Sequence, residues 1–465
     1  MAQKINPFII TFTGQSGCGK SFIKGVMQEY CKARGLSGAE PFLDYTTEGD
    51  FQNKGDFKPY DFSKFDIKKN CLLVPFMKYT ERAGRGAEDR GEAISCPNGI
   101  PDECDIIYEN YGYRYGVSSM DLVNALNEGL CPLIVLNNVR AIETIRKHFP
   151  TLSLFAYRTQ ANEEIFLKTE QDRNIDGKRT EAQVAKDART RFSKASALHA
   201  TWTENMGLFD NLILNVSEGP TDTRKQVFNI LDEAVQKSCR NFLTPKAREE
   251  KAKNSAKLII VAGSNAKFGN NKLGAKDAVV SAASQVYKTC VDIVPKMTTR
   301  AKKADDIGEM ICNQSVNQLK KHCDIIYKND GLLGSSYGLS SKLIKDRLAR
   351  SSKNQMIAVS NPKAIRQLND IFGSEHVMNI FAYSYGDKSP EGEEAFKTYC
   401  ENTTLFDRTF LYDGSNKENL NEQLERVLRE CDCPNAEFRL KIEKMRKLSI
   451  EQSNGQNQQQ SVRKV

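Results

Sequence analysis

The chain has 465 residues, of which 39% are hydrophobic and 27% charged. This length exceeds what one hydrophobic core ordinarily serves, so we expect two or three domains of a soluble globular protein. No apolar run is long enough to cross a bilayer and no signal peptide precedes the first predicted strand, which predicts a cytoplasmic protein without a membrane anchor. The formal net charge of +8 is modest and spread out, so nucleic acid is not an expected partner. The thirteen cysteines include no C-x-x-C pair, which favours reduced thiols over a zinc site.

The first predicted element is a strand that leads into a glycine-rich loop and then a helix. The strand is the apolar run 8–12, and Phe22, Ile23 and Val26 follow at helical spacing. The loop between them reads Gly14, Gln15, Ser16, Gly17, Cys18, Gly19, Lys20 and Ser21. In this context G-x-x-x-x-G-K-S predicts a phosphate-binding loop, because backbone N–H groups and the positive end of the helix face the phosphate oxygens. Lys20 would contact the β- and γ-phosphates of ATP, and the Ser21 hydroxyl would bind Mg²⁺.

Strands and helices alternate through the rest of the first half. Residues 38–70 show no clear period and are predicted to be an insertion or a mobile surface segment. The strands are expected at 72–77, 105–108, 132–136, 152–157 and 209–216, and the helices at 20–34, 120–130, 141–149, 162–191 with a break near 176, and 223–237. Such alternation predicts an α/β fold with a parallel sheet flanked by helices, as in P-loop NTPases.

Much of this order returns in the second half. The run 258–263 repeats the first strand, Asp324 to Tyr327 repeats Asp105 to Tyr108, and Tyr337 to Ser341 repeats Tyr115 to Ser119. We therefore predict two tandem domains of the same fold. The first is expected at 1–240, a linker at 241–255, the second domain at 256–435, and a helical then disordered tail at 436–465.

The second copy lacks parts that the first copy has. Where the glycine loop belongs it reads Gly263 to Lys272, without Gly-Lys-Ser and with a different spacing. The charged stretch 158–207 of the first copy corresponds to the shorter 384–404, which contains no arginine. A kinase needs arginines over the transferring phosphoryl group, so the second copy is predicted to be non-catalytic. It would stabilise the first copy, form a homodimer or bind a protein partner.

Four short motifs follow one another in the first half. They are the glycine loop at 14–21, Arg82-x-x-Arg85-x-x-Glu88, Tyr115-Gly116-Val-Ser118, and Lys178-Arg179-Thr180-Glu181 followed by Arg189. In this order and at these spacings they resemble the motifs of the guanylate kinase family. The resemblance covers most of residues 7–235 and, in weaker form, 257–430.

The resemblance implies ATP-dependent phosphoryl transfer to a nucleoside monophosphate, with GMP as the leading acceptor. It implies that Arg82, Arg85, Glu88, Tyr108, Tyr115 and Ser118 bind the acceptor, and that Lys20 acts in catalysis with Arg179 and Arg189 of a mobile lid. Two arginines three positions apart suit this role, because both planar guanidinium groups can converge on one phosphate. Closure of the lid would also exclude water that otherwise hydrolyses ATP.

The acceptor remains open at this point, because two features differ from the family pattern. The strand at 132–136 runs into Asn137 and Asn138, where the family has an aspartate, and Asp105 and Glu109 both lie one residue away from the position of the guanine-binding glutamate. Asn138-Val-Arg140-Ala141 and the run Tyr111 to Val117 also resemble ribose bisphosphate phosphokinases, which phosphorylate a sugar phosphate. A third alternative is a non-enzymatic binding protein, since guanylate-kinase-like folds also serve as scaffolds.

Overall fold

The structure is a computed structural model. It describes residues 5–14, 17–34, 36, 73–82, 92–158, 163–172, 174, 177–216, 220–253, 257–264, 273–302, 310–328, 334–384, 387–412 and 417–431. The chain divides into two compact units, of which unit 1 comprises residues 1–251 with 396–408 and unit 2 comprises 252–395 with 409–465. The expectations for 38–70 and for the tail at 436–465 lie outside the described residues. Among the described helices, none has both the length and the apolar composition needed to cross a membrane.

Unit 1 is built on a five-stranded parallel sheet with the order β2-β7-β1-β8-β9. Its strands are β1 (Ile9–Gly14), β2 (Leu73–Pro75), β7 (Cys131–Val135), β8 (Thr151–Tyr157) and β9 (Asn211–Leu214). In the middle of the sheet Ile10 pairs with Leu133 on one side and Leu152 on the other. The strands are apolar nearly throughout because helices cover both faces of the sheet.

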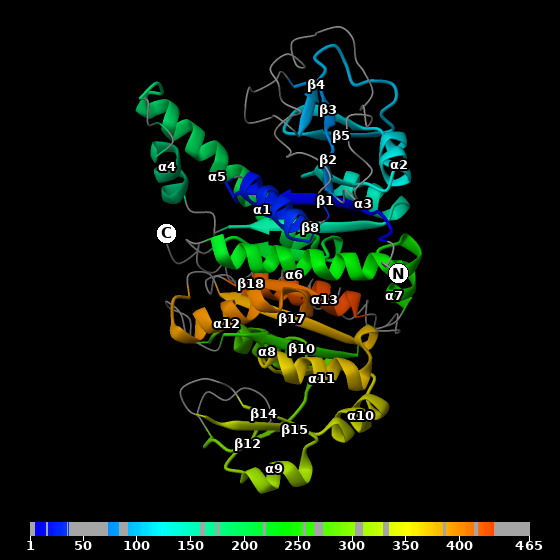
Figure 1. Cartoon of the computed structure of the whole chain (residues 1–465). Helices are drawn as coiled ribbons and strands as arrows, with labels where there is room; N and C mark the ends of the chain where they lie inside the picture. The colour runs from blue at the N-terminus through cyan, green and yellow to red at the C-terminus, as the bar shows by residue number, and fades with distance from the viewer. Residues whose placement is uncertain are drawn as a thin grey trace, which may run out of the picture. The chain divides into compact units, whose positions relative to one another are not determined.

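One face of this sheet carries α1 (Lys20–Ala33) and α6 (Pro220–Cys239), drawn in blue and green in Figure 1. Phe12 packs there with Val26 of α1 and Ile230 of α6, all almost completely buried. On the opposite face Phe155 contacts Trp202, with 5.3 Å between ring centroids. Each such side chain contributes about 1.5–3 kcal/mol to stability through its burial. The other helices of unit 1 are α2 (Ser119–Asn127), α3 (Val139–His148), α4 (Glu163–Asp172), α5 (Glu181–Glu204) and α7 (Pro245–Lys253).

A second, four-stranded sheet in unit 1 has the order β4-β3-β6-β5, and we call it the small sheet. It consists of β3 (Lys78–Thr80), β4 (Ala93–Ser95), β5 (Ile106–Asn110) and β6 (Tyr113–Val117). β5 and β6 form an antiparallel hairpin whose two turn residues, Tyr111 and Gly112, have φ of 53° and 77°. Positive φ at both turn positions matches the right-handed twist of the strands and keeps the hairpin compact.

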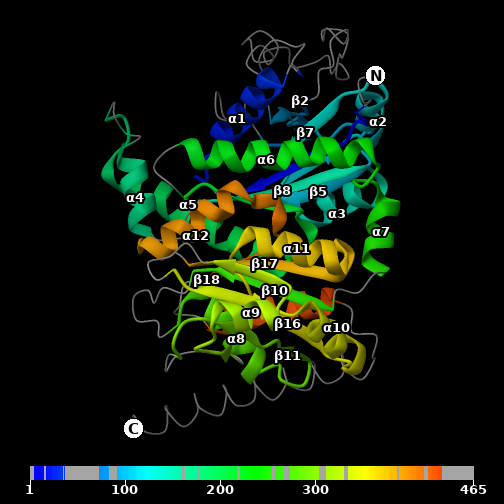
Figure 2. The ribbon, with the colours of Figure 1, turned by 60° about the horizontal axis from the view of Figure 1, so that its bottom comes forward.

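Unit 2 repeats both sheets with the same strand orders, β11-β16-β10-β17-β18 and β13-β12-β15-β14. Its strands are β10 (Leu258–Gly263), β11 (Val291–Ile293), β12 (Lys296–Thr298), β13 (Met310–Ile311), β14 (Ile325–Lys328), β15 (Ser336–Leu339), β16 (Asn354–Ala358), β17 (Val377–Ser384) and β18 (Arg408–Tyr412). Its helices are α8 (Ala275–Gln285), α9 (Val316–His322), α10 (Ser341–Arg350), α11 (Pro362–Phe372), α13 (Lys417–Glu430) and the start of α12 (Pro390–Glu401), whose residues from 396 onward belong to unit 1. Helix α11 lies on β17 of the parallel sheet (Figure 2). The predicted α/β class, with a helix-flanked parallel sheet in each half, is confirmed.

The segment 396–408, which lies between β17 and β18 in the chain, belongs to unit 1. The Tyr399 hydroxyl donates a hydrogen bond of 2.7 Å to the carbonyl of Leu212 in β9, and the Tyr399 side chain is 1% exposed. The Asn229 amide of α6 donates to the carbonyl of Cys400 at 3.1 Å. Unit 1 therefore draws part of its core from residues far along the chain.

Asp210, just before β9, connects α3, α7 and β8. It accepts hydrogen bonds from the Arg146 guanidinium at 2.7 Å and from the Ser153 N–H at 2.7 Å, and Arg248 of α7 lies 3.7 Å away. Burial alone would raise the pKa of Asp210, but the two arginines and the Ser153 N–H hold it well below its ordinary value of 3.8. Arg248 also donates to the carbonyl of Thr151, so much of the segment predicted as a linker is a helix fixed to unit 1.

Asp210→Asn is expected to lower the free energy of unfolding of unit 1 by about 2 kcal/mol at pH 7, because it leaves two arginines without their carboxylate. A depressed pKa contributes stability above the ordinary pKa, and this contribution is lost as pH falls below about 4. The difference between wild type and D210N should therefore shrink between about pH 5 and pH 2. Urea unfolding followed by Trp202 fluorescence measures it, and a difference that does not change with pH would contradict the assignment.

Candidate functional site

The glycine loop of unit 1 joins the end of β1 to the start of α1. Gly19 stands at the N-cap of α1 with φ of 80°, and no side chain caps the helix. A Cβ on Gly19 would lie 2.6 Å from Nδ2 of Asn215, so a larger residue does not fit there. Asn215 donates to the Cys18 carbonyl at 2.8 Å and accepts from Thr223 at 2.8 Å. Asn215 therefore holds the Cys18–Gly19 part of the loop in place. No side chain caps the first N–H groups of α1, which leaves them available to an anion.

Lys20 is the first residue of α1, and its Nζ donates to the carbonyl of Gly14 at 3.0 Å. The side chain therefore folds back over the loop instead of extending into solvent. Ser21 is exposed, and Gln15 and Ser16 lie outside the described residues. The Cys18 thiol is fully buried, and burial raises its pKa, so it fills the loop as a neutral group.

A carboxylate that sequence reasoning missed lies near Lys20. Glu92, just before β4, forms an ion pair of 3.0 Å with Lys24 of α1. Burial would raise the pKa of Glu92, but the charges of Lys78, Lys24 and Lys20 lower it. Lys78 in turn donates to the Val135 carbonyl at 2.9 Å, at the end of β7. These contacts place the small sheet beside the glycine loop and the carboxyl edge of the parallel sheet, where open α/β sheets bind ligands.

Two tyrosines expected to bind the acceptor lie together on the small sheet. The rings of Tyr108 and Tyr115 stack at 5.4 Å with an interplanar angle of 10°, and the Lys78 Nζ lies 5.9 Å from the Tyr115 ring. The Tyr108 hydroxyl is buried and has no hydrogen-bond partner in the described part of the chain. Burial raises the pKa of Tyr108, so this phenol stays neutral and can donate its proton to an anion.

Arg82 and Lys194 reach the same hairpin turn from different elements. The Arg82 guanidinium lies 5.6 Å from the Tyr113 ring, and the Lys194 Nζ of α5 lies 4.6 Å from the Tyr111 ring. Desolvation lowers the pKa of Lys194, and the positive charges of Arg82 and Arg191 lower it further. Sequence reasoning did not identify Lys194. The like charges gathered here repel one another unless an anion binds between them.

Arg179 and Arg189, the arginines expected in the lid, contact carboxylates, and so does Arg191, which the sequence motifs did not single out. Arg179 contacts Glu170 at 2.7 Å and Asp187 at 3.0 Å, and Arg191 contacts Glu170 at 2.9 Å. Glu170 is 1% exposed, so one buried carboxylate balances two arginines. Arg189 is 76% exposed and pairs with Glu163. Lys194, three residues after Arg191 on α5, lies over the Tyr111 ring of the small-sheet hairpin instead.

The remaining expected site residues have local partners or are not described. The Ser118 hydroxyl accepts from the Asp121 N–H at 3.1 Å and caps α2. Both carboxylate oxygens of Asp105 accept from Ser119, at 2.8 Å from its N–H and 2.5 Å from its hydroxyl. Arg85 and Glu88 lie outside the described residues, so the expected convergence of Arg82 and Arg85 on one phosphate stays a prediction.

Two asparagines, Asn137 and Asn138, follow the end of β7. Asn138 caps α3 by accepting from the Ala141 N–H at 3.0 Å. Oδ1 of Asn137 is buried and has no hydrogen-bond partner among the residues that the structure describes. The described part of the chain holds no group of three or more His, Cys, Asp or Glu side chains suited to a metal. A Mg²⁺ ion here would therefore depend on nucleotide phosphates, Ser21 and water, with Asn137 as an acceptor for a bound water.

Unit 2 has counterparts of the small-sheet residues, and among its described residues a lysine lies near the end of the central strand. Tyr327 and Tyr337 stack at 5.6 Å, and Arg300 donates to the Tyr337 hydroxyl at 3.3 Å. Near the end of β10, Lys276 of α8 is 4% exposed and donates to the Ser360 hydroxyl at 3.2 Å. That hydroxyl donates to the Gly263 carbonyl at 3.1 Å, so a buried lysine faces inward in the second copy.

Comparisons with known proteins give a similarity at the level of structure. No protein-family model matches the sequence, and no curated protein matches it. Among solved structures, the guanylate kinase from Anaplasma phagocytophilum is similar to this chain with 18% identical residues and a TM-score of 0.28, over 51% of this chain and 90% of that one.

Proposed function

We propose that unit 1 transfers a phosphoryl group from MgATP to a nucleoside monophosphate, with GMP as the leading acceptor, and that unit 2 is a non-catalytic copy. The observation that supports this most directly is the arrangement of cations. Lys20 lies at the glycine loop, and Arg82 and Lys194 both lie over rings of the small-sheet hairpin, where their positive charges interact. Positive charge from three separate elements suits an acceptor phosphate next to a nucleotide triphosphate.

The roles follow from the charges that move in the reaction. The acceptor phosphate carries about two negative charges and must approach the γ-phosphate in line. Arg82 would hold that phosphate, with Tyr108 donating a neutral hydrogen bond to it. Lys20 would neutralise charge on the donor phosphates, and Arg191 and Lys194 of α5 would do so between donor and acceptor. Arg179 would join them only by exchanging its carboxylate partners for phosphate oxygens. ATP and Mg²⁺ are the cofactors that this chemistry requires.

The ribose bisphosphate acceptor stays the second candidate because of Asp105. Both oxygens of this carboxylate already accept hydrogen bonds from Ser119, which gives Asp105 a local role at the start of α2. A sugar phosphate needs the same phosphate contacts and no base-reading carboxylate.

A coupled assay with MgATP and each nucleoside monophosphate, run on the full chain, tests the proposal. We expect turnover of GMP to GDP with kcat/KM at least about tenfold above that of any other nucleoside monophosphate. Turnover of ribose 1,5-bisphosphate and of no nucleotide would establish the second candidate instead. Failure to bind MgATP in calorimetry would leave only a non-enzymatic binding role.

A further inference from the structure

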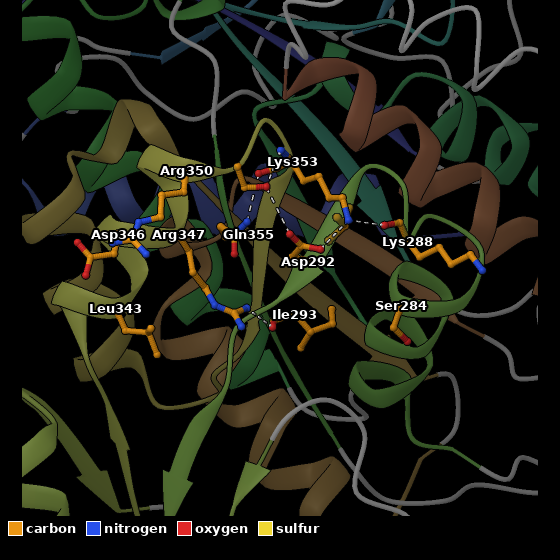
Figure 3. Close-up of a pocket in the computed structure, with 12 residues that line it drawn as sticks. Ser284, Lys288, Asp292, Ile293, Leu343, Asp346, Arg347, Arg350, Lys353 and Gln355 are labelled. Atoms are coloured by element: carbon orange, nitrogen blue, oxygen red, sulfur yellow. Dashed lines mark hydrogen bonds and ion pairs between the residues drawn. The ribbon is translucent and has the colours of Figure 1, made fainter.

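Unit 2 contains a pocket of about 920 Å³ at the edge of its parallel sheet, away from the end of β10. Its polar lining consists mainly of Lys288, Asp292, Arg347, Arg350, Lys353 and Gln355, which we call the basic groove. Figure 3 shows Arg347 and Arg350 reaching it from α10, with Lys288 on the opposite side and Asp292 and Lys353 between them. The volume lies in the range of small-molecule sites.

The charges of the groove do not cancel. Lys353 pairs with Asp292 at 2.9 Å and also donates to the Lys288 carbonyl at 3.0 Å. Arg347 donates to the Ile293 carbonyl at 2.9 Å, which fixes its guanidinium at the rim. With Lys288 and Arg350 the lining carries four cations against two carboxylates, Asp292 and Asp346. The excess of positive charge favours an anionic ligand.

Unit 1 shows that the fold does not require these polar groups. Met356 and Leu133 occupy equivalent positions in the two sheets, since each pairs with the second residue of the central strand. By the same register Gln355, Lys353 and Asp292 correspond to Pro132, Leu130 and Val74. Counted from the capping serines Ser340 and Ser118, Arg347 and Arg350 correspond to Ala125 and Glu128.

In unit 1 this corner of the fold is ordinary hydrophobic core. Val74 and Ala125 are 0% exposed and Leu130 is 1% exposed. Replacing such residues by Asp, Arg and Lys costs stability unless the polar groups gain partners. In unit 2 the replacements are partly paired with one another and with backbone carbonyls, and they line a pocket at the surface instead of a closed core.

A buried amide at the base of the groove lacks one of its partners. Gln355 is 0% exposed, and its Nε2 donates to the Lys353 carbonyl at 3.3 Å. Its Oε1 has no hydrogen-bond partner among the described residues. Because buried amide oxygens are almost always satisfied, this atom calls for an N–H or O–H donor. A small rotation of the side chain would present the oxygen to a ligand in the groove.

We infer that the basic groove of unit 2 binds a small organic phosphate that carries at least two phosphate charges and a hydroxyl or amino donor. Arg347, Arg350 and Lys288 contact the phosphates, and Gln355 accepts from the donor. The site takes no part in the chemistry proposed for unit 1, so each can fail without the other.

Calorimetry on the full chain with fructose 1,6-bisphosphate, a phosphate-rich probe with free hydroxyls, tests the inference. Wild type should bind it, and hydrogen exchange should slow at 284–293 and 343–355. The exposed pair K288Q/R350Q should bind at least about tenfold more weakly, because two charge-assisted contacts are removed. Lys342→Gln, on the same α10 but outside the groove, is the matched control and should bind as wild type does.

Gln355→Leu separates the amide from the charges. This variant should bind fructose 1,6-bisphosphate more weakly than wild type does. Its affinity for inorganic pyrophosphate, which has no sugar hydroxyl to donate to Gln355, should change little. Thermal melts show whether each variant is folded, and urea unfolding followed by Trp202 fluorescence shows whether unit 1 is intact. No heat and no change in exchange at millimolar probe, or equal affinity for K288Q/R350Q and wild type, would overturn the inference.

Discussion

Lys20→Ala is expected to abolish phosphoryl transfer from MgATP to GMP, with kcat/KM at least about 10³-fold below wild type. The Lys20 ammonium lies over the glycine loop, 3.0 Å from the Gly14 carbonyl, where donor phosphates would bind. Alanine keeps the helix but removes the charge that would neutralise the leaving phosphate oxygens. The coupled assay measures the loss of turnover, and calorimetry measures the accompanying loss of MgATP affinity.

The chain provides a matched control on the same helix. Lys32 is exposed and lies in the last turn of α1, so Lys32→Ala removes the same charge far from the loop. It should retain wild-type kcat/KM. Equal turnover by K20A and wild type would show that the glycine loop does not hold the donor, and the proposed reaction would fall with it.

Tyr399→Ala should lower the free energy of unfolding of unit 1 by about 3–5 kcal/mol, the usual cost of deleting a buried aromatic ring. Tyr399 is almost completely buried in unit 1, although it lies far beyond residue 251 in the chain. Trp202 is the single tryptophan of the protein and belongs to unit 1. Urea unfolding followed by its fluorescence therefore reports this unit specifically.

Tyr399→Phe isolates the hydrogen bond from the ring. It should cost about 1 kcal/mol, because only the bond to the Leu212 carbonyl is lost. A truncated chain that ends at residue 251 should be less stable than the full chain by at least as much as Y399A. If Y399A leaves the Trp202 transition unchanged, the segment 396–408 does not contribute to the core of unit 1.

The sequence predicted those features that depend on neighbours along the chain. The apolar run before Gly14 and the helical spacing after Ser21 sufficed to predict β1, the loop and α1. The repeat of short motifs predicted that the second half has the same fold, which the identical strand orders confirm. The site residues chosen from motifs remain predictions, since the structure fixes the contacts of Arg82 or Tyr115 but not their ligands.

Other features depend on contacts between residues that are distant in the chain, and no local sequence pattern predicts them. Asn215 supports the glycine loop from the end of β9, and Glu92 approaches Lys20 from the small sheet. Lys194 looks in sequence like any charge on a long helix, and only its position over Tyr111 distinguishes it. The basic groove depends on the pairing of β11 with β16, which brings Asp292 beside Gln355 although the two residues lie in different parts of the chain.

The buried Glu170 has a consequence for selectivity. Because this carboxylate already satisfies Arg179 and Arg191, either arginine gains by leaving it only for an anion of greater charge. A phosphorylated acceptor offers such an exchange and an unphosphorylated nucleoside does not. If the proposed function holds, Arg179 and Arg191 therefore leave Glu170 only for a ligand that carries a phosphate. A nucleoside without a phosphate would leave both arginines paired with Glu170.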